Sequence, residues 1–81
     1  MSVCLDDRST DIVQTANGKY VYIDTCWPWD RNCYETMVFK CDENGKVTNW
    51  SELDAAWYDN PKYADIGHAE MINKWMKEVL V

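Results

Sequence analysis

Apolar and polar residues alternate along two stretches of the chain, and each stretch contains an Asn-Gly pair. The first, DIVQTANGKYVYIDT, contains Asn17-Gly18, and the second, YETMVFKCDENGKVTNW, contains Asn44-Gly45. Alternation is typical of half-buried strands, and Asn-Gly between two such runs is the strongest short signal for a hairpin. The pattern therefore predicts two antiparallel β-hairpins, each closed by a two-residue type I′ turn.

A two-residue turn fixes which residues face each other in the first hairpin. Ile12 then lies opposite Ile23, and the pleat places Ile12, Val21 and Ile23 on one side of the sheet. The same register sets Asp11 against Asp24, a like-charge pair that is unfavourable. We expect the ladder to end there or a cation to lie between the two carboxylates. The other side of the hairpin carries Val13, Tyr20 and Tyr22.

The second hairpin has two kinds of pairing that agree on one register. Glu43 faces Lys46 next to the turn, and Phe39 faces Trp50. Opposite charges and aromatic rings are both favourable as cross-strand pairs, so the agreement supports this register. The predicted core face carries Met37, Phe39, Cys41 and Trp50.

The segments between these elements give weaker signals. Residues 1–9 are expected to form a loose arm, and CWPWDRN (26–32) a connector, because its proline interrupts a ladder. Ser51 and Asp54 resemble a capping box, which would allow one helical turn. We favour a further short strand over residues 55–59 instead.

The last part of the chain has the periodicity of a helix. Asn60 and Pro61 are a favourable N-cap and first helical residue. Gly67 costs about 1 kcal/mol against Ala in a helix, which is tolerated where a strand or a Trp lies close to the backbone. We predict a helix over residues 61–80 that covers the sheet with Ala64, His68, Met71, Ile72, Trp75 and Val79.

These elements predict one domain of the α+β class over residues 1–81. Two antiparallel hairpins form a small sheet, and one C-terminal helix packs on one face of it. The β-rich part covers residues 10–59, and the helical part covers residues 60–81.

The charge balance narrows the classes of partner. Fourteen acidic residues against eight basic ones give a net charge of −6, which argues against direct nucleic-acid binding. No apolar run approaches the roughly 18 residues of a membrane span, and the N-terminus lacks the pattern of a signal peptide. We therefore expect a cytoplasmic protein with no membrane contact, in a compartment that keeps thiols reduced.

The cysteines do not have the spacing of a zinc site. Cys26, Cys33 and Cys41 are separated by six and seven residues, whereas zinc knuckles place two cysteines two to four residues apart. Cys4, Cys26, Cys33, Cys41 and His68 could still meet in space, and a disulfide is a further alternative. We expect reduced, mostly buried thiols and no metal or other cofactor.

Nothing in the sequence predicts an enzyme. It contains no phosphate-binding loop, glycine-rich nucleotide turn or nucleophile elbow. His68 is the one histidine, and it lies on the apolar stripe of the predicted helix. A packed histidine of this kind usually has a structural hydrogen-bond partner, and Glu35 is the candidate.

The chain has more aromatic residues than one helix and one small sheet can bury, with five Trp and five Tyr. Exposed Tyr and Trp are typical anchors of protein interfaces, although a second minor core under the CWPW segment would also use them. The predicted binding residues are four anchors, Tyr20, Tyr22, Trp27 and Trp29, with Asp24 and Asp30 steering the partner.

Two blocks, YETMVF (34–39) and GHAEMINKW (67–75), resemble recurring segments of small bacteriophage and prophage proteins. The resemblance covers residues 34–76 and implies a product that acts in the cytoplasm of a bacterial host. No catalytic residues are assigned in that group, so none are carried over.

These observations lead to one main hypothesis of function. We expect a non-enzymatic protein that binds a bacterial host protein, such as a basic nucleic-acid-binding protein. Inhibition of a defence system, in the manner of anti-CRISPR proteins, would be a typical task by analogy. The alternatives are a module that self-associates through its sheet edge or its Tyr20 and Tyr22 face, and a small metalloprotein that uses Cys26, Cys33, Cys41 and His68.

Overall fold

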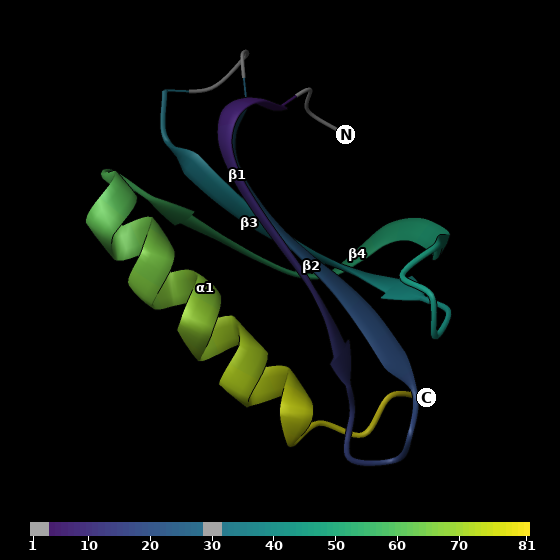
Figure 1. Cartoon of the computed structure of the whole chain (residues 1–81). Helices are drawn as coiled ribbons and strands as arrows, with labels where there is room; N and C mark the ends of the chain where they lie inside the picture. Colours follow the sequence, from purple (N-terminus) through teal and green to yellow (C-terminus); the bar gives the residue numbers. More distant parts are fainter. Residues whose placement is uncertain (1–3, 29–31) are drawn as a thin grey trace.

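The residues that the structure describes form a four-stranded antiparallel sheet with one helix across a single face (Figure 1). The computed structural model describes the backbone of residues 4–28 and 32–81, and the side chains of residues 9–27 and 32–81. Neighbouring strands in the sheet are also neighbours in the chain. The elements are β1 (Cys4–Gln14), β2 (Tyr20–Pro28), β3 (Tyr34–Cys41), β4 (Val47–Tyr58) and α1 (Pro61–Met76). The predicted α+β class, with two hairpins and a C-terminal helix, is confirmed.

Both hairpins turn where Asn-Gly predicts, but the turns are longer than expected. In the first, Thr15 N–H donates to Lys19 O at 2.9 Å and Gly18 N–H donates to Thr15 O at 3.1 Å. The same two bonds in residues 42–46 measure 2.9 and 3.0 Å. The glycines have φ of 81° and 84°, a region that glycine enters without steric cost. Each turn is therefore a three-residue loop with a glycine bulge, not a type I′ turn.

The extra loop residue shifts the register of the first hairpin by one position. Asp11 pairs with Ile23, so the predicted Asp11–Asp24 and Ile12–Ile23 pairs are both wrong. A shift of one residue moves every side chain of a strand to the other face. Val13, which is 5% exposed, therefore faces the core, whereas Ile12 is 49% exposed on the opposite side.

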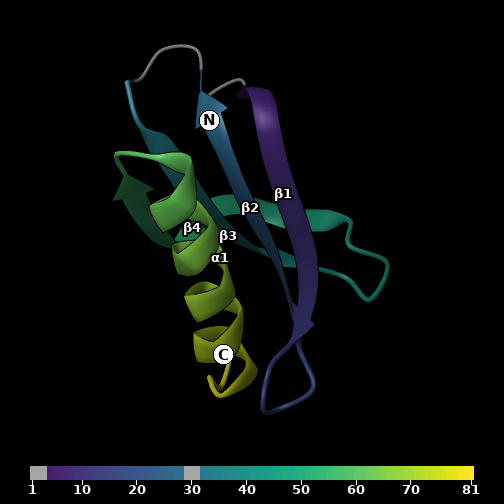
Figure 2. The same cartoon turned by 60° about the vertical axis from the view of Figure 1, so that its left-hand side comes forward.

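The second hairpin is bent by a large irregularity in β4. Between the pairs Lys40–Asn49 and Val38–Asp54, residues 50–53 of β4 stand opposite a single residue of β3. Bulges bend a strand and increase its twist. The β3–β4 turn consequently lies on the side of β1 away from α1 (Figure 2). Because β4 continues through residues 55–58, the preference for a strand over a helical turn there is confirmed.

Two strands begin or end beyond their predicted limits. β1 starts at Cys4, so the loose arm predicted for residues 1–9 is wrong for residues 4–9. β2 continues through Pro28, so the predicted connector is wrong for residues 26–28. The start of β1 pairs irregularly, with two register shifts before Ser9, and its polar sequence lacks the alternation of a half-buried strand.

The core lies between α1 and one face of the sheet. Val38 and Thr36 of β3 are both 0% exposed and belong to the face that α1 covers. The predicted core face of Met37, Phe39, Cys41 and Trp50 is therefore not the face that α1 covers, although Phe39 and Cys41 are buried on it, whereas Trp50 is 58% exposed. Both faces of β3 are apolar, so alternation alone could not say which of them the helix covers. The core cluster consists of Val13, Val21, Ile23, Val38, Met71 and Trp75.

The helix begins where the sequence predicts and ends four residues earlier. Asn60 Oδ1 accepts from Tyr63 N–H at 2.9 Å, which confirms the N-cap. After Met76 the chain leaves the helix and bonds to the first turn. Ala16 N–H donates to Glu78 O at 2.9 Å, and Asn17 Nδ2 donates to Leu80 O at 2.7 Å. The C-terminal segment therefore ties the end of α1 to the β1–β2 turn.

Gly67 allows α1 to approach the edge of the sheet closely. A Cβ atom at this position would overlap with the ring of Tyr58 in β4. The predicted close approach is confirmed, with a tyrosine as the neighbour. Of the predicted apolar stripe, Ala64, His68, Met71 and Trp75 are buried, whereas Val79 lies beyond α1 and is 65% exposed.

Candidate functional site

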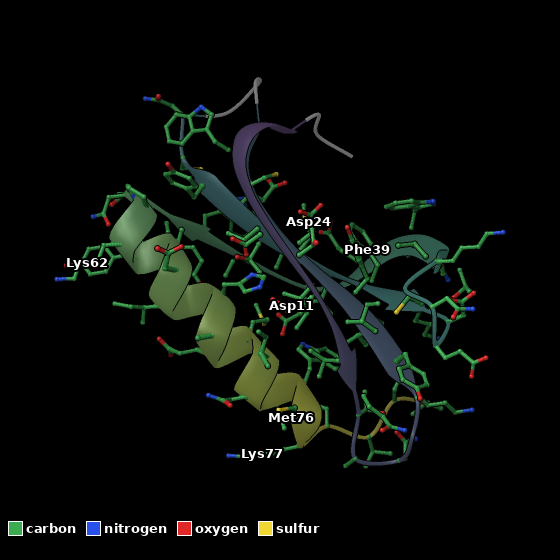
Figure 3. All side chains as sticks on the ribbon, viewed as in Figure 1. Asp11, Asp24, Phe39, Lys62, Met76 and Lys77 are labelled. Carbon is green, nitrogen blue, oxygen red and sulfur yellow. The ribbon has the colours of Figure 1, made fainter. Side chains whose placement is uncertain are left out.

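The face of the sheet opposite α1, which we call the far face, carries apolar side chains that no described helix covers. It consists of the residues that alternate with the core positions, among them Ile12, Tyr22, Phe39 and Trp57. Figure 3 shows Phe39 on the side of the sheet away from α1. Ile12 is 49% exposed and Trp57 is 51% exposed, whereas Phe39 is only 2% exposed and packs against Trp50. Exposed large apolar groups are typical of a protein-binding surface.

The predicted anchors do not form one surface. Tyr20 and Tyr22 lie on the far face, and both are half-buried. Trp27 lies on the opposite face, where its ring meets Tyr34 edge-on with centroids 5.0 Å apart. Asp24 is on the far face but only 7% exposed, and it has an interaction partner, so it is poorly placed to steer a ligand from a distance. Trp29 and Asp30 lie outside the residues that the structure describes.

The most exposed aromatic rings of the far face are two tryptophans of β4 that the predicted binding set does not include. Trp50 is 58% exposed and Trp57 is 51% exposed. A partial signal for Trp57 is its position in an edge segment of the predicted sheet. The exposure of Trp50 follows from the irregularity at residues 50–53, which has no clear mark in the sequence.

Both tryptophans are held in place by neighbours on β3. The Trp50 ring packs edge-on against Phe39 with centroids 5.1 Å apart, as the sequence predicts for this pair. Trp57 Nε1 donates to Glu35 Oε2 at 3.1 Å. Glu35 is only 2% exposed, so its buried carboxylate holds the Trp57 indole in a fixed position. A ring that is already ordered loses little conformational entropy when a partner binds.

A shallow depression lies beside Ile12 on the same face. It has a volume of about 280 Å³ and lies between β1 and the β3–β4 turn. The turn approaches so closely that a Cβ atom on Gly45 would collide with Ile12. The lining residues are Thr10, Asp11, Ile12, Tyr22, Asn44 and Gly45. The depression is just below the usual size of a small-molecule site, and it would admit one side chain of a partner.

The segment that contains both exposed tryptophans is also the most acidic described part of the chain. Residues 42–59 contain five carboxylates (Asp42, Glu43, Glu52, Asp54 and Asp59) and one Lys, a net charge of −4. Asp54 faces α1, where it is bonded to Lys74, whereas Glu43, Glu52 and Asp59 are exposed. A partner with basic groups around an apolar centre would complement this surface.

A chain of hydrogen-bonded polar groups lies on the other face, between α1 and the sheet. His68 Nδ1 is 2.6 Å from Thr25 Oγ1, which is 2.6 Å from Thr36 Oγ1. His68 Nε2 is 2.7 Å from Asp11 Oδ2, and Figure 3 places Asp11 on the side toward α1. The predicted His68–Glu35 pair is wrong, because Glu35 belongs to the far face. The one-residue register shift brings Asp11 to His68 instead.

This chain has the carboxylate–imidazole–hydroxyl order of a hydrolase triad, but its hydroxyls are inaccessible. Thr25 is 4% exposed and Thr36 is 0% exposed. A nucleophile must reach its substrate, and α1 covers both groups. The arrangement therefore acts as a polar connection between helix and sheet.

The cysteines differ from the prediction in one respect. Cys26 is disulfide-bonded, so the expectation of reduced thiols is wrong for it, whereas Cys33 and Cys41 are free. Burial, and then the charge of Asp42, raises the pKa of Cys41 above its ordinary value of 9.0. Among the side chains that the structure describes, no three His, Cys, Asp or Glu residues are grouped to hold a metal ion. Cys26 and His68 are already engaged by other partners, which argues against the metalloprotein alternative.

Comparisons of the chain with protein-family models, with curated proteins and with solved structures find no match. The resemblance to phage proteins therefore stays a prediction. Within residues 4–28 and 32–81, no helix has the length and apolar character that crossing a membrane requires.

Proposed function

We propose that this protein is a non-enzymatic binding module whose far face docks a basic protein partner. The observation that carries the proposal is the pair of half-exposed tryptophans, Trp50 and Trp57, within the acidic segment 42–59. Trp is the residue most enriched at energetic centres of protein interfaces, and the surrounding acids would select a partner rich in Lys and Arg. The depression beside Ile12 adds a place for one partner side chain.

The resemblance to phage proteins supports a finer version of the same proposal. The partner would be a bacterial host protein that binds nucleic acid, since such proteins present clusters of Lys and Arg. Covering that basic surface would block the nucleic acid and inhibit the partner. The buried hydroxyls of Thr25 and Thr36 favour a binding role over catalysis.

Affinity capture from a bacterial lysate with matched variants tests the proposal. Trp50→Ala and Trp57→Ala should each lose a basic protein that the wild-type chain retains. Val79→Ser is the control, because Val79 is 65% exposed but lies in the C-terminal segment, outside the acidic segment 42–59 and its two tryptophans. Circular dichroism should show the same fold for all variants.

Charge reversal and added salt provide a second, independent test. Glu43→Lys and Glu52→Lys should weaken capture, and capture by the wild-type chain should fall as salt rises, because salt screens exposed charges. A captured protein that Val79→Ser loses as readily as Trp50→Ala, or that binds equally at low and high salt, would refute the proposal.

A further inference from the structure

The outward side of α1 is a second exposed surface, separate from the far face. Three large apolar side chains on it are half-exposed: Tyr63 at 57%, Ile66 at 46% and Met76 at 55%. Ala69 and Asn73 are also exposed and complete a row with spacings of three and four residues. Residues at these spacings are neighbours on a helix surface. We call Tyr63, Ile66, Ala69, Asn73 and Met76 the outer stripe, and none of them is charged.

The helix differs from the rest of the chain in charge. Within Pro61–Met76, Lys62 and Lys74 balance Asp65 and Glu70, so the net charge of α1 is zero. Since the whole chain carries −6, all of the excess negative charge lies outside α1. A basic partner would find little attraction on this surface. A second copy of the chain, which the acidic far face would repel, meets no net repulsion here.

The outer stripe is also complementary to itself. Tyr63 and Met76 are equidistant from the point between residues 69 and 70, and so are Ile66 and Asn73. A two-fold axis at that point would pair two antiparallel helices so that Tyr63 meets Met76 and Ile66 meets Asn73, while Ala69 beside the axis meets Glu70. Methionine sulfur against an aromatic ring is a favourable contact, and a small residue at the centre lets two helices approach closely.

We propose that a second copy of this chain docks on the outer stripe, with the two α1 helices antiparallel about this two-fold axis. The interface is isologous, so every contact occurs twice. Asp65 of one copy faces Lys74 of the other, although Lys74 Nζ is already bonded to Asp54 of its own chain at 2.6 Å. Lys62 faces Lys77, and Figure 3 shows these two lysines pointing away from the sheet at opposite ends of α1. This dimer is separate from the far face and does not depend on the function proposed for it.

The geometry makes the dimer weak and dependent on concentration. A helix of 16 residues is about 24 Å long. One such helix pair buries less than the roughly 800 Å² per partner of a stable complex. The two Lys62–Lys77 pairs oppose association further, and salt should reduce that opposition.

Sedimentation velocity of the full chain over a range of concentrations tests the proposal. The wild-type chain should shift from monomer to dimer as concentration rises. Ile66→Ser should weaken the dimer about tenfold or more, because it removes an apolar side chain from both halves of the interface. Ile12→Ser is the matched control, since Ile12 is 49% exposed on the far face, and it should leave the dimer unchanged.

A charge reversal tests the antiparallel arrangement itself. Lys62→Glu places an opposite charge beside Lys77 of the other copy and should tighten the dimer about threefold to fivefold. Asp65→Lys faces Lys74 and should weaken it. A wild-type chain that stays monomeric at every concentration would overturn the proposal. So would a dimer weakened equally by Ile12→Ser and Ile66→Ser, or one that Lys62→Glu does not tighten.

Discussion

Replacing Asp54 by Ala should destabilise the packing of α1 on β4 far more than removing its ion-pair partner, Lys74. Asp54 Oδ2 accepts from Lys74 Nζ at 2.6 Å and from Trp75 Nε1 at 3.2 Å. Asp54 Oδ1 accepts from Ala55 N–H at 3.0 Å. One carboxylate therefore connects two residues of the helix with the backbone of the edge strand.

The exposed fractions of Trp75 and Lys74 determine how much each of their contacts with Asp54 contributes to the free energy of unfolding. Trp75 is 8% exposed, so its indole N–H would lose its partner inside the core, at a cost of about 1–3 kcal/mol. The Lys74 side chain is 52% exposed, and an exposed ion pair contributes about 0.2–1 kcal/mol. The hydrogen bond to Asp54 raises the pKa of Lys74, but solvent screening keeps the energy of that pair small. Asp54→Ala should therefore cost about 2–3 kcal/mol, and Lys74→Ala less than about 1 kcal/mol.

Urea unfolding of Asp54→Ala, Lys74→Ala and the double variant measures these terms. The coupling energy between Asp54 and Lys74 should stay below about 1 kcal/mol. Asp54→Asn keeps an acceptor for the Trp75 indole and should lie between the two single variants. If Lys74→Ala costs as much as Asp54→Ala, the ion pair and not the buried indole holds the helix, and the reasoning is refuted.

Two further predictions concern titration and thiol chemistry. Burial raises the pKa of Cys41 and Tyr58, and the bond to Asp54 raises that of Lys74. All three groups hold their protons more tightly when folded, so the urea midpoint should fall as the pH rises above about 9, less steeply in Tyr58→Phe. A midpoint that is constant or rises over that range would contradict this. Peptide mapping after alkylation without reductant should find Cys26 unmodified and Cys33 modified faster than Cys41 in the folded chain; alkylated Cys26 would show that its disulfide is absent in solution.

The elements themselves could be predicted because their signals are local. The Asn60 side chain caps the helix by accepting from the backbone N–H of Tyr63, three residues away in the sequence. Asn-Gly likewise marks both turns whatever surrounds them. The end of the helix could not be found in this way. Leu80 forms hydrogen bonds with Asn17, a residue far away in the sequence, and these bonds replace a last helical turn.

The candidate site could be predicted only in part, because it depends on two choices that the sequence leaves open. Asn-Gly fits a two-residue turn and also a three-residue turn with a glycine bulge, and the two differ by one residue of register. That residue decides whether Ile12 or Val13 faces the core. The second choice is the face of the sheet that α1 covers. Both faces of β3 are apolar, so the pattern of β3 does not show which face this is.

The same two choices explain why the exposed tryptophans differ from the predicted anchors, and they also connect the two proposed surfaces. Figure 2 shows α1 on one side of the sheet. Since α1 covers the face with Val38, its exposed outer stripe and the far face lie on opposite sides of the sheet. A dimer formed through α1 would leave both far faces free, so it could bind two partner molecules or one partner with two sites. In the second case binding gains from effective concentration, and Ile66→Ser should weaken capture although it does not touch the far face. For a partner with a single site, Ile66→Ser should leave capture unchanged while Trp57→Ala abolishes it, so this pair of variants separates the two surfaces.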